Sequence, residues 1–499
     1  MRERVAIVFM TVNVVATLAI GGAIAWVFSH PGHAPATQAS SGTYQPGSTT
    51  SGPTSSGVAG TTHTSGGTGG GSSSVTPASG GGTASTGKTS SGGKTSGGSS
   101  SSGKSSSGKS SSGGSSGSGS GSASSPSNQS TPAQGVNRGV ITVGGIYDET
   151  GPVDATVERD TVRSYFDLVN ANGGVDGYKL RLIDCDSKYD PSAAHQCAQK
   201  LISEGVLAIV GWLSLSGEQT ETPYLTQQGV PIIGGLGVPA EYASPLSFPT
   251  TPSLVTEGSA LGTRACQLKL QKPGVVFLNA NFIAPVEQSF LNAMKKCGIS
   301  PVDVETVDAT KADYTDVVLK FQAGGAQSVA AFLDPFSYAR LFQAMERQDF
   351  HPPVLGGGLD KASANQQYDS GCGSSCAVFG ANSATPVLEY LDHTSVPAIE
   401  QYLGAVHTYY PSQYPALDVY SSYQWLAAEV FTQAIKDIGS APVTRQSLVT
   451  ALDNLKNFND GGLTEPITYG SGNHDPLHCL QWLHNTNGKW STVSGWNCF

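Results

Sequence analysis

A sharp change in composition near residue 135 limits which part of this chain can fold. Residues 34–135 consist mainly of Ser, Gly and Thr with scattered Lys, as in Gly103-Lys104-Ser105-Ser106. Such a segment buries too little apolar surface to offset the entropy lost on ordering, so we expect a disordered linker. The folded body is therefore expected within residues 136–499, a length that suits two lobes.

An apolar run precedes the linker. A helix over Val5–Phe28 would measure roughly 36 Å at about 1.5 Å per residue, enough to cross a bilayer core of about 30 Å. Arg2 and Arg4 precede the run, and basic residues favour the cytoplasmic side. We therefore expect residues 1–33 to anchor the chain, with the N-terminus in the cytoplasm and the body outside the cell. The alternative is a signal peptide cleaved near Ala34-Pro35-Ala36, which would leave the body secreted.

The charge of the chain argues against a nucleic-acid partner. The formal net charge is −10, and every acidic residue except Glu3 lies in residues 136–499. A groove that follows a phosphate backbone needs clustered Lys and Arg, and the body contains no such cluster.

The cysteines fit an exported body. All eight lie after residue 136, and an even number in an oxidising compartment indicates disulfides. The sequence leaves their connectivity open, and pairing of neighbours gives Cys185–Cys197, Cys266–Cys297, Cys372–Cys376 and Cys479–Cys498. His474, His478 and Cys479 lack an evident fourth zinc ligand, so we expect no metal site and no cofactor.

Short β-rich runs alternate with amphipathic helical stretches in the body, which predicts an α/β fold of two doubly wound lobes. The long helices are expected at Pro397–Tyr409 and Asp418–Ile438, and a C-terminal hairpin at Cys479–Trp496. The strands of the first set are expected at Val140–Ile146, Lys179–Asp184, Val206–Gly211 and Val230–Gly234. Those of the second set are expected at Val275–Asn279, Val302–Val307, Ser328–Leu333 and Val354–Gly357.

The order of these motifs resembles the branched-chain amino-acid (Leu/Ile/Val-type) substrate-binding proteins of ABC importers, which have the type I periplasmic binding protein fold. The landmarks are Gly145–Gly151, Asn170–Gly177, Asp184–Pro191, Leu201–Gly211 and Asn487–Trp490. The resemblance implies two lobes joined by a hinge, which close over one small molecule. It places the first lobe at residues 139–250 plus 385–460 and the second at residues 251–384 plus 461–499.

The resemblance also implies where the first lobe touches a ligand, namely in the loops that follow its strands. After the third strand, small hydroxyl residues and backbone amides at a helix N-terminus suit a ligand carboxylate. The alternatives are ordinary structural roles, such as helix capping for Ser216 and packing for Trp212. The candidate ligand-binding residues of this lobe are Asp148, Thr150, Trp212, Ser214, Ser216, Leu236 and Gly237.

The second lobe and the long C-terminal helix add further candidates: Asn281, Phe282, Phe336, Asp360 and Tyr420. Asp360 lies near the position where amino-acid binders of the family place an acidic group for the ligand ammonium. Val238 stands near a position where the family usually has threonine, and valine cannot donate a hydrogen bond, which argues against an α-amino acid. The aromatic and aliphatic candidates indicate a ligand with a sizeable apolar part.

The function implied by the resemblance is that of an extracytoplasmic, monomeric solute-binding protein that delivers its ligand to an ABC permease. Candidate ligands are a branched-chain amino acid, an amide or a related apolar-bodied acid. The alternative is a ligand sensor of the same fold that acts through a membrane partner. An enzyme is not expected, because no nucleophile–base motif occurs outside the linker and no zinc-binding helix is present.

Overall fold

A computed structural model describes residues 134–359, 376–472 and 474–499. The predicted anchor and nearly all of the predicted linker lie outside these residues. None of the helices in the described ranges combines the length and the hydropathy that a membrane span requires.

The first lobe is built on a six-stranded sheet. It contains β1 (Val136–Asn137), β2 (Val140–Tyr147), β3 (Lys179–Asp186), β4 (Ile209–Val210), β5 (Ile232–Ile233) and β6 (Ser247–Phe248). Strand β2 pairs in parallel with β3 and β4, the sheet continues in parallel to β6, and only β1 is antiparallel. The carboxyl ends of the parallel strands therefore meet at one edge, where the following loops come together.

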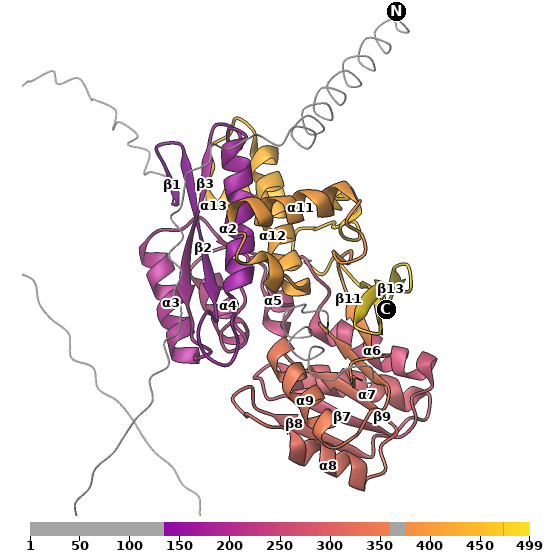
Figure 1. Cartoon of the computed structure of the whole chain (residues 1–499). Coiled ribbons are helices and arrows are strands. Elements are labelled where there is room, and N and C mark those ends of the chain that lie inside the picture. Colours follow the sequence, from indigo (N-terminus) through magenta and orange to yellow (C-terminus); the bar gives the residue numbers. More distant parts are fainter. Residues whose placement is uncertain (1–133, 360–375, 473) are drawn as a thin grey trace, which may run out of the picture. The chain divides into compact units, whose positions relative to one another are not determined.

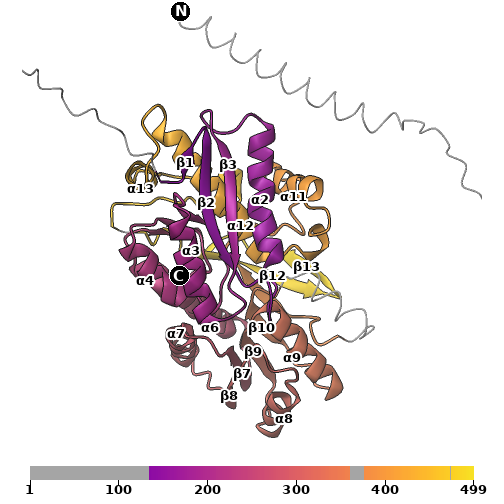
Figure 2. The ribbon, with the colours of Figure 1, turned by 90° about the vertical axis from the view of Figure 1, so that its left-hand side faces the viewer.

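Helices cover both faces of this sheet. They are α2 (Thr156–Ala171), α3 (Pro191–Ser203), α4 (Glu218–Gln227) and the short α5 (Pro239–Ala243). Figure 2 shows β2 and β3 between α2 on one side and α3 and α4 on the other. Asp190 caps α3 by accepting a hydrogen bond from the Ala193 amide at 2.8 Å, with Pro191 as the first helical residue, as its sequence predicts.

Three helices from the C-terminal half complete the first lobe: α11 (Pro397–Tyr409), α12 (Val419–Ile438) and α13 (Arg445–Asp453). Helices α11 and α12 contact α2, and α13 contacts α12 (Figure 1). The Tyr165 and Trp425 rings pack edge to face with centroids 4.8 Å apart, and Gln424 Nε2 donates to the Trp212 carbonyl at 3.1 Å. The first lobe thus combines two stretches that are far apart in sequence.

The second lobe is built on an eight-stranded sheet with the order β13-β12-β11-β10-β9-β7-β8, and β14 pairs with β12. Strands β7 to β11 are mutually parallel, whereas β12, β13 and β14 add antiparallel. The strands are β7 (Pro273–Leu278), β8 (Asp303–Val307), β9 (Ser328–Phe332), β10 (Val354–Gly357), β11 (Asn382–Thr385), β12 (Cys479–Thr486), β13 (Lys489–Thr492) and β14 (Asn497–Cys498). The helices are α6 (Leu254–Leu268), α7 (Ile283–Lys296), α8 (Thr315–Ala323) and α9 (Pro335–Arg347).

The chain passes between the lobes after β6, after β11 and again before β12. The last crossing differs from the predicted boundary at residue 461. Leu463, Ile467, Tyr469 and Leu477 are buried in the core of the first lobe, and only β12 and the residues after it join the second sheet. These apolar side chains follow α13 directly, so they pack on the core that α13 covers.

Three of the four predicted disulfides are confirmed. Cys185–Cys197 joins β3 to α3, Cys266–Cys297 joins α6 to the end of α7, and Cys479–Cys498 joins β12 to β14. Cys376 is also disulfide-bonded, but Cys372, its predicted partner, lies outside the described residues.

Two local predictions were wrong. The third and fourth strands of the first lobe are much shorter than predicted, because only Ile209–Val210 and Ile232–Ile233 take part in the ladder. Ser216 does not cap α4. The N-cap is Gly217, and no side chain caps this helix.

Candidate functional site

A cavity lies between the two lobes, at the carboxyl ends of the strands of both sheets. Its empty volume is about 910 Å³, including the solvent at its mouth. Its wall on one side comprises Leu213, Leu215 and Leu236 from loops of the first sheet, which we call the first-lobe wall. Its wall on the other side comprises residues of α6, α7, α9 and the ends of β7, β9 and β10, which we call the second-lobe wall.

The cavity is predominantly apolar. Leu278, Phe282 and Phe336 line the second-lobe wall, and Tyr420 and Tyr423 of α12 line the space between the walls. Pockets of this composition hold small molecules through buried apolar area, with a few polar groups that fix orientation. The arrangement therefore suits a ligand with a substantial hydrocarbon or aromatic body.

The first-lobe wall rests on a buried carboxylate that follows β2. Asp148 is fully buried, and its Oδ1 accepts hydrogen bonds from Ser187 Oγ at 2.6 Å and from the Tyr189 amide at 2.8 Å. Its Oδ2 accepts from the Leu215 amide at 2.8 Å, and Ser214 Oγ lies 3.4 Å from Oδ1. Burial raises the pKa of Asp148, and these donors oppose that shift. Asp148 thus ties three loops together.

Two further buried carboxyl groups hold the loops after β4 and β5. Glu218 accepts from the Ser214 amide at 3.0 Å and from the Leu236 amide at 2.8 Å, and Glu241 accepts from the Gly237 amide at 3.0 Å. Burial raises the pKa of Glu218 to about 7. Burial and the neighbouring Glu218 charge raise the pKa of Glu241 well above its usual value. We call Asp148, Glu218 and Glu241 the carboxyl network.

A glycine makes this arrangement possible. Gly235 has φ +116°, and a Cβ there would lie 2.6 Å from a carboxylate oxygen of Glu241. Only glycine combines this backbone conformation with such a close approach. The glycines around Leu236 therefore allow the loop to wrap around the carboxyl network. They do not form a nucleotide-binding turn.

The second-lobe wall carries a carboxyl group that has no partner within the described residues. Glu257, in the first turns of α6, lines the cavity, and burial raises its pKa to about 7. A Cβ on Gly357 would lie only 1.9 Å from Glu257 Oε1, so the carboxyl group lies directly over the backbone of β10. Thr251 also lines the cavity, and its Oγ1 is buried without a hydrogen-bond partner in the described part of the chain.

Another acidic residue of this wall has a structural role. Asp334 caps α9 by accepting hydrogen bonds from the Phe336 and Ser337 amides, both at 3.0 Å, and from Ser337 Oγ. Burial raises the pKa of Asp334, and these donors oppose the shift. The cap fixes the start of α9 and thereby the position of Phe336.

The structure brings some of the candidate ligand-binding residues to the cavity and not others. Leu236, Phe282, Phe336 and Tyr420 line it. Asp148 and Ser214 belong to the buried hydrogen bonds beneath the first-lobe wall, and Trp212 is fully buried against α3 and α4 residues. Asp360 lies outside the described residues.

The remaining candidates lie near the cavity without lining it. Thr150 is exposed and its Oγ1 donates to Asp186 at 2.7 Å, and the Gly237 amide is bonded to Glu241. Asn281 Nδ2 donates to the Ser216 carbonyl at 3.4 Å, so these two candidates meet across the lobes. Ser216 Oγ has no partner among the described residues.

The most informative lining residues that sequence reasoning missed are Thr251, Leu254, Glu257 and Gly357. The Ser253 side chain accepts from the Thr256 amide at 3.0 Å and caps α6, and this cap could have been recognised in the sequence. It would have located the start of α6. The orientation of Glu257 towards the cavity depends on the packing of β10. This orientation could not have been recognised in the sequence.

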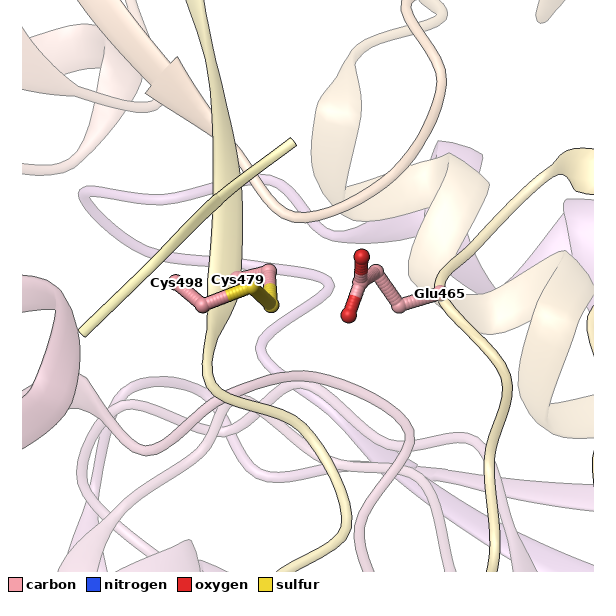
Figure 3. Close-up of side chains that lie close together, drawn as sticks. All are labelled: Glu465, Cys479 and Cys498. Carbon is pink, nitrogen blue, oxygen red and sulfur yellow. A yellow bond between two sulfur atoms is a disulfide. The ribbon is translucent and has the colours of Figure 1, made fainter. Parts of the chain in front are cut away.

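One cluster outside the cavity has the composition of a metal site. Figure 3 shows the Glu465 carboxylate pointing towards Cys479 and Cys498, with ligand atoms within 4.8 Å of one another. The two sulfur atoms are joined in a disulfide, whereas a metal-binding cysteine needs a free thiolate. The cluster is therefore a disulfide beside a carboxylate.

Comparisons with known proteins agree with this architecture. A family model described as "Periplasmic binding protein" matches residues 140–489. Leu/Ile/Val-binding protein homolog 3 of Brucella melitensis is 22% identical over 354 residues, which cover 65% of this chain and 89% of that protein.

Two solved structures show the same fold. A fatty acid ABC transporter substrate-binding protein from Thermomonospora curvata has a TM-score of 0.65 and 19% identity, over 74% of this chain and 95% of that chain. A branched chain amino acid ABC transporter from Thermus thermophilus with bound valine has a TM-score of 0.64 and 17% identity, over 72% and 97% of the two chains.

Proposed function

The chain belongs to the periplasmic binding protein family, and we propose that it is the extracytoplasmic solute-binding component of an ABC importer. In this role the two lobes close over one small organic molecule and present it to a permease. The branched-chain amino acids, amides and apolar-bodied acids considered from the sequence all remain candidates at this level.

The apolar cavity between the lobes is the observation that carries this proposal. Its wall is formed by loops of both sheets, so a ligand there gains contacts from each lobe. Contacts of this kind favour the closed state over the open one, because only the closed state provides both sets at once. Of the structural neighbours, one is a fatty acid ABC transporter substrate-binding protein and another was solved with bound valine, which supports a small molecule with an apolar body.

The location outside the cytoplasm is supported by the disulfides, which persist in oxidising compartments. We propose that Val5–Phe28 anchors the chain and that the Ser/Gly-rich segment is a flexible tether. About 100 flexible residues have a root-mean-square reach of roughly 50–60 Å. A tether of this reach would let the body diffuse near a membrane-bound permease and act as a monomer.

A thermal-shift screen of the full-length chain tests the binding function. A ligand at about 100 times its dissociation constant adds about 2.7 kcal/mol to the free energy of unfolding, which produces a clear rise in melting temperature. The screen should include amino acids, amides, fatty and aromatic acids, and apolar amines and alcohols. If no compound raises the melting temperature, the proposed function is wrong.

A matched pair of variants then assigns the site. Leu254→Trp fills the cavity from the first turn of α6, whereas Leu319→Trp changes a half-exposed residue of α8 that does not line the cavity. We expect Leu254→Trp to abolish the ligand-induced shift and Leu319→Trp to retain it. Retention of the shift in both variants would place the binding site elsewhere.

A further inference from the structure

The first-lobe wall presents few backbone donors to a ligand, because the chain already uses them. The amides of Ser214 and Leu215 donate to Glu218 and Asp148, and those of Leu236 and Gly237 donate to Glu218 and Glu241, at 2.8–3.0 Å. In the sequence analysis, the amides and hydroxyl groups of the loop after β4 were the expected partners of a ligand carboxylate. The carboxyl network therefore takes up the donors that such a carboxylate would need.

The charges around the cavity also disfavour an anionic ligand. The lining contains Asp154, Glu158, Glu257 and Asp334, and within the described residues it contains no Lys, Arg or His. A ligand carboxylate that enters an apolar cavity loses its hydration and requires a cation or several donors in return. The described walls supply acidic groups instead.

Two polar groups of the lining have no hydrogen-bond partner within the described residues, Thr251 Oγ1 and the Glu257 carboxyl group. Thr251 is 2% exposed, so its hydroxyl group has lost water without gaining a protein partner. A buried polar group without a partner is destabilising, and where it faces the cavity, as Glu257 does, a ligand can restore a hydrogen bond.

We propose that the ligand is an apolar monoamine without a carboxylate group, and that Glu257 receives its ammonium group. This inference rests on the proposed binding function and names the ligand class for the same cavity. The Glu257 carboxylate accepts the ammonium hydrogens, and the hydrocarbon body lies against Leu278, Phe282 and Phe336.

The surroundings of Glu257 explain why an amine matches better than other head groups. The Tyr338 hydroxyl group lies over the backbone of β10, as Glu257 does, but it donates to the Ala331 carbonyl at 2.6 Å. Burial raises the pKa of Glu257 to about 7, because no described group compensates the charge of the ionised form. A charge-assisted hydrogen bond to an ammonium group is stronger than one to a neutral donor, and it restores the ionised carboxylate.

The decisive experiment compares three ligands that share one body. 3-Methylbutylamine is leucine without its carboxylate, and 4-methylpentanoate is leucine without its amino group. Isothermal titration of the full-length chain at pH 8 should give an affinity for the amine at least tenfold higher than for leucine or the acid. The pair octylamine and octanoate repeats the comparison with a longer body and should show the same order.

Two variants connect the preference to Glu257. Glu257→Gln keeps the size of the side chain but removes its charge, and it should weaken amine binding by tenfold or more. Glu400→Gln, an exposed position of α11 that does not line the cavity, should leave the amine affinity unchanged. An equal loss in both variants, or no loss in Glu257→Gln, would overturn the role of Glu257.

The outcomes separate this inference from the proposed function. If leucine, 4-methylpentanoate or octanoate binds more tightly than the matched amine, the monoamine proposal is wrong while the binding function stands. If neither these ligands nor any compound of the wider screen binds, both fail. Binding of the amines that Leu254→Trp does not abolish would show that they bind outside the cavity and would overturn the proposal.

Discussion

The two walls of the cavity use carboxyl groups in opposite ways. Beneath the first-lobe wall, Asp148, Glu218 and Glu241 are fully buried and bonded to backbone amides of the loops they hold. In the second-lobe wall, Glu257 faces the cavity and has no partner within the described residues. Buried carboxyl groups with partners fix a backbone, whereas one without a partner is available for recognition. We therefore assign shape to the first wall and head-group selection to the second.

The largest expected effect comes from removing an anchor of the first wall. Asp148→Ala leaves the buried amides of Tyr189 and Leu215 without acceptors, and each unsatisfied group costs about 1–3 kcal/mol. We expect the free energy of unfolding to fall by about 4 kcal/mol in urea denaturation.

Asp154→Ala is the matched control for this variant. Asp154 is exposed and, among the described residues, accepts only from the Thr156 amide at 3.0 Å, so its loss should cost less than about 1 kcal/mol. If the two substitutions destabilise the chain equally, Asp148 does not anchor the first wall.

The second prediction concerns pH and the carboxyl pair of the first wall. Folding raises the pKa of Glu218 from 4.5 to about 7, so the folded state favours the protonated form. The corresponding stability is complete below about pH 4.5 and is lost as the pH rises through about 7. We expect about 3 kcal/mol less stability at pH 8 than at pH 4.5 from this group.

Urea denaturation at several pH values measures this loss. Glu257 and Asp148 also have raised pKa values and likewise lower the stability as the pH rises. The pH dependence of the wild-type stability therefore does not by itself identify Glu218 as the cause. Glu218→Gln cannot titrate, and its slope should be shallower than that of the wild type. Equal slopes in the two proteins would contradict a raised pKa of Glu218 in the folded state.

Much of the fold could be predicted from the sequence because its signals are local. The helix at Pro397–Tyr409 and the strand at Val354–Gly357 have the predicted bounds, since proline, glycine and the apolar period mark them. The order of strands and helices also gave the family correctly. Cysteine neighbours paired as expected, because each described pair joins elements that are adjacent in the chain.

The candidate site was less predictable because it depends on which way each loop residue turns. Sequence reasoning identified the loop after β4, but there Leu213 and Leu215 face the cavity while Trp212 and Ser214 are buried behind it. Glu257 lies on a helix with an ordinary amphipathic pattern, and its exposure to the cavity arises from contact with β10, a hundred residues later. Such contacts are set by tertiary packing and leave no local pattern.

The third prediction moves the carboxyl group of the second wall without removing it. Gly357→Ala places a methyl group where Glu257 Oε1 now lies, so Glu257 must turn away from the strand. We expect the affinity for 3-methylbutylamine to fall about tenfold, measured by isothermal titration. The double variant Glu257→Ala/Gly357→Ala should bind 3-methylbutylamine with the same affinity as Glu257→Ala alone, because the effects of substitutions at residues in contact are not additive. Additive losses would show that Gly357 acts independently of Glu257.

The smallest expected effect concerns the contact between the walls. Asn281 Nδ2 donates to the Ser216 carbonyl across the lobes at 3.4 Å, an exposed and long hydrogen bond that contributes little by itself. Asn281→Ala should leave the free energy of unfolding within about 0.5 kcal/mol of the wild type.

Because the bond forms between the lobes, its loss should weaken amine binding about twofold, through faster dissociation in stopped-flow measurements. Asn292 is an exposed residue of α7 whose Oδ1, within the described part of the chain, accepts only from Gln288 on the same helix. Asn292→Ala should therefore change neither quantity. A tenfold or larger loss in Asn281→Ala would mean that contact between the lobes contributes as much to binding as Glu257 does, and that head-group selection is not confined to the second wall.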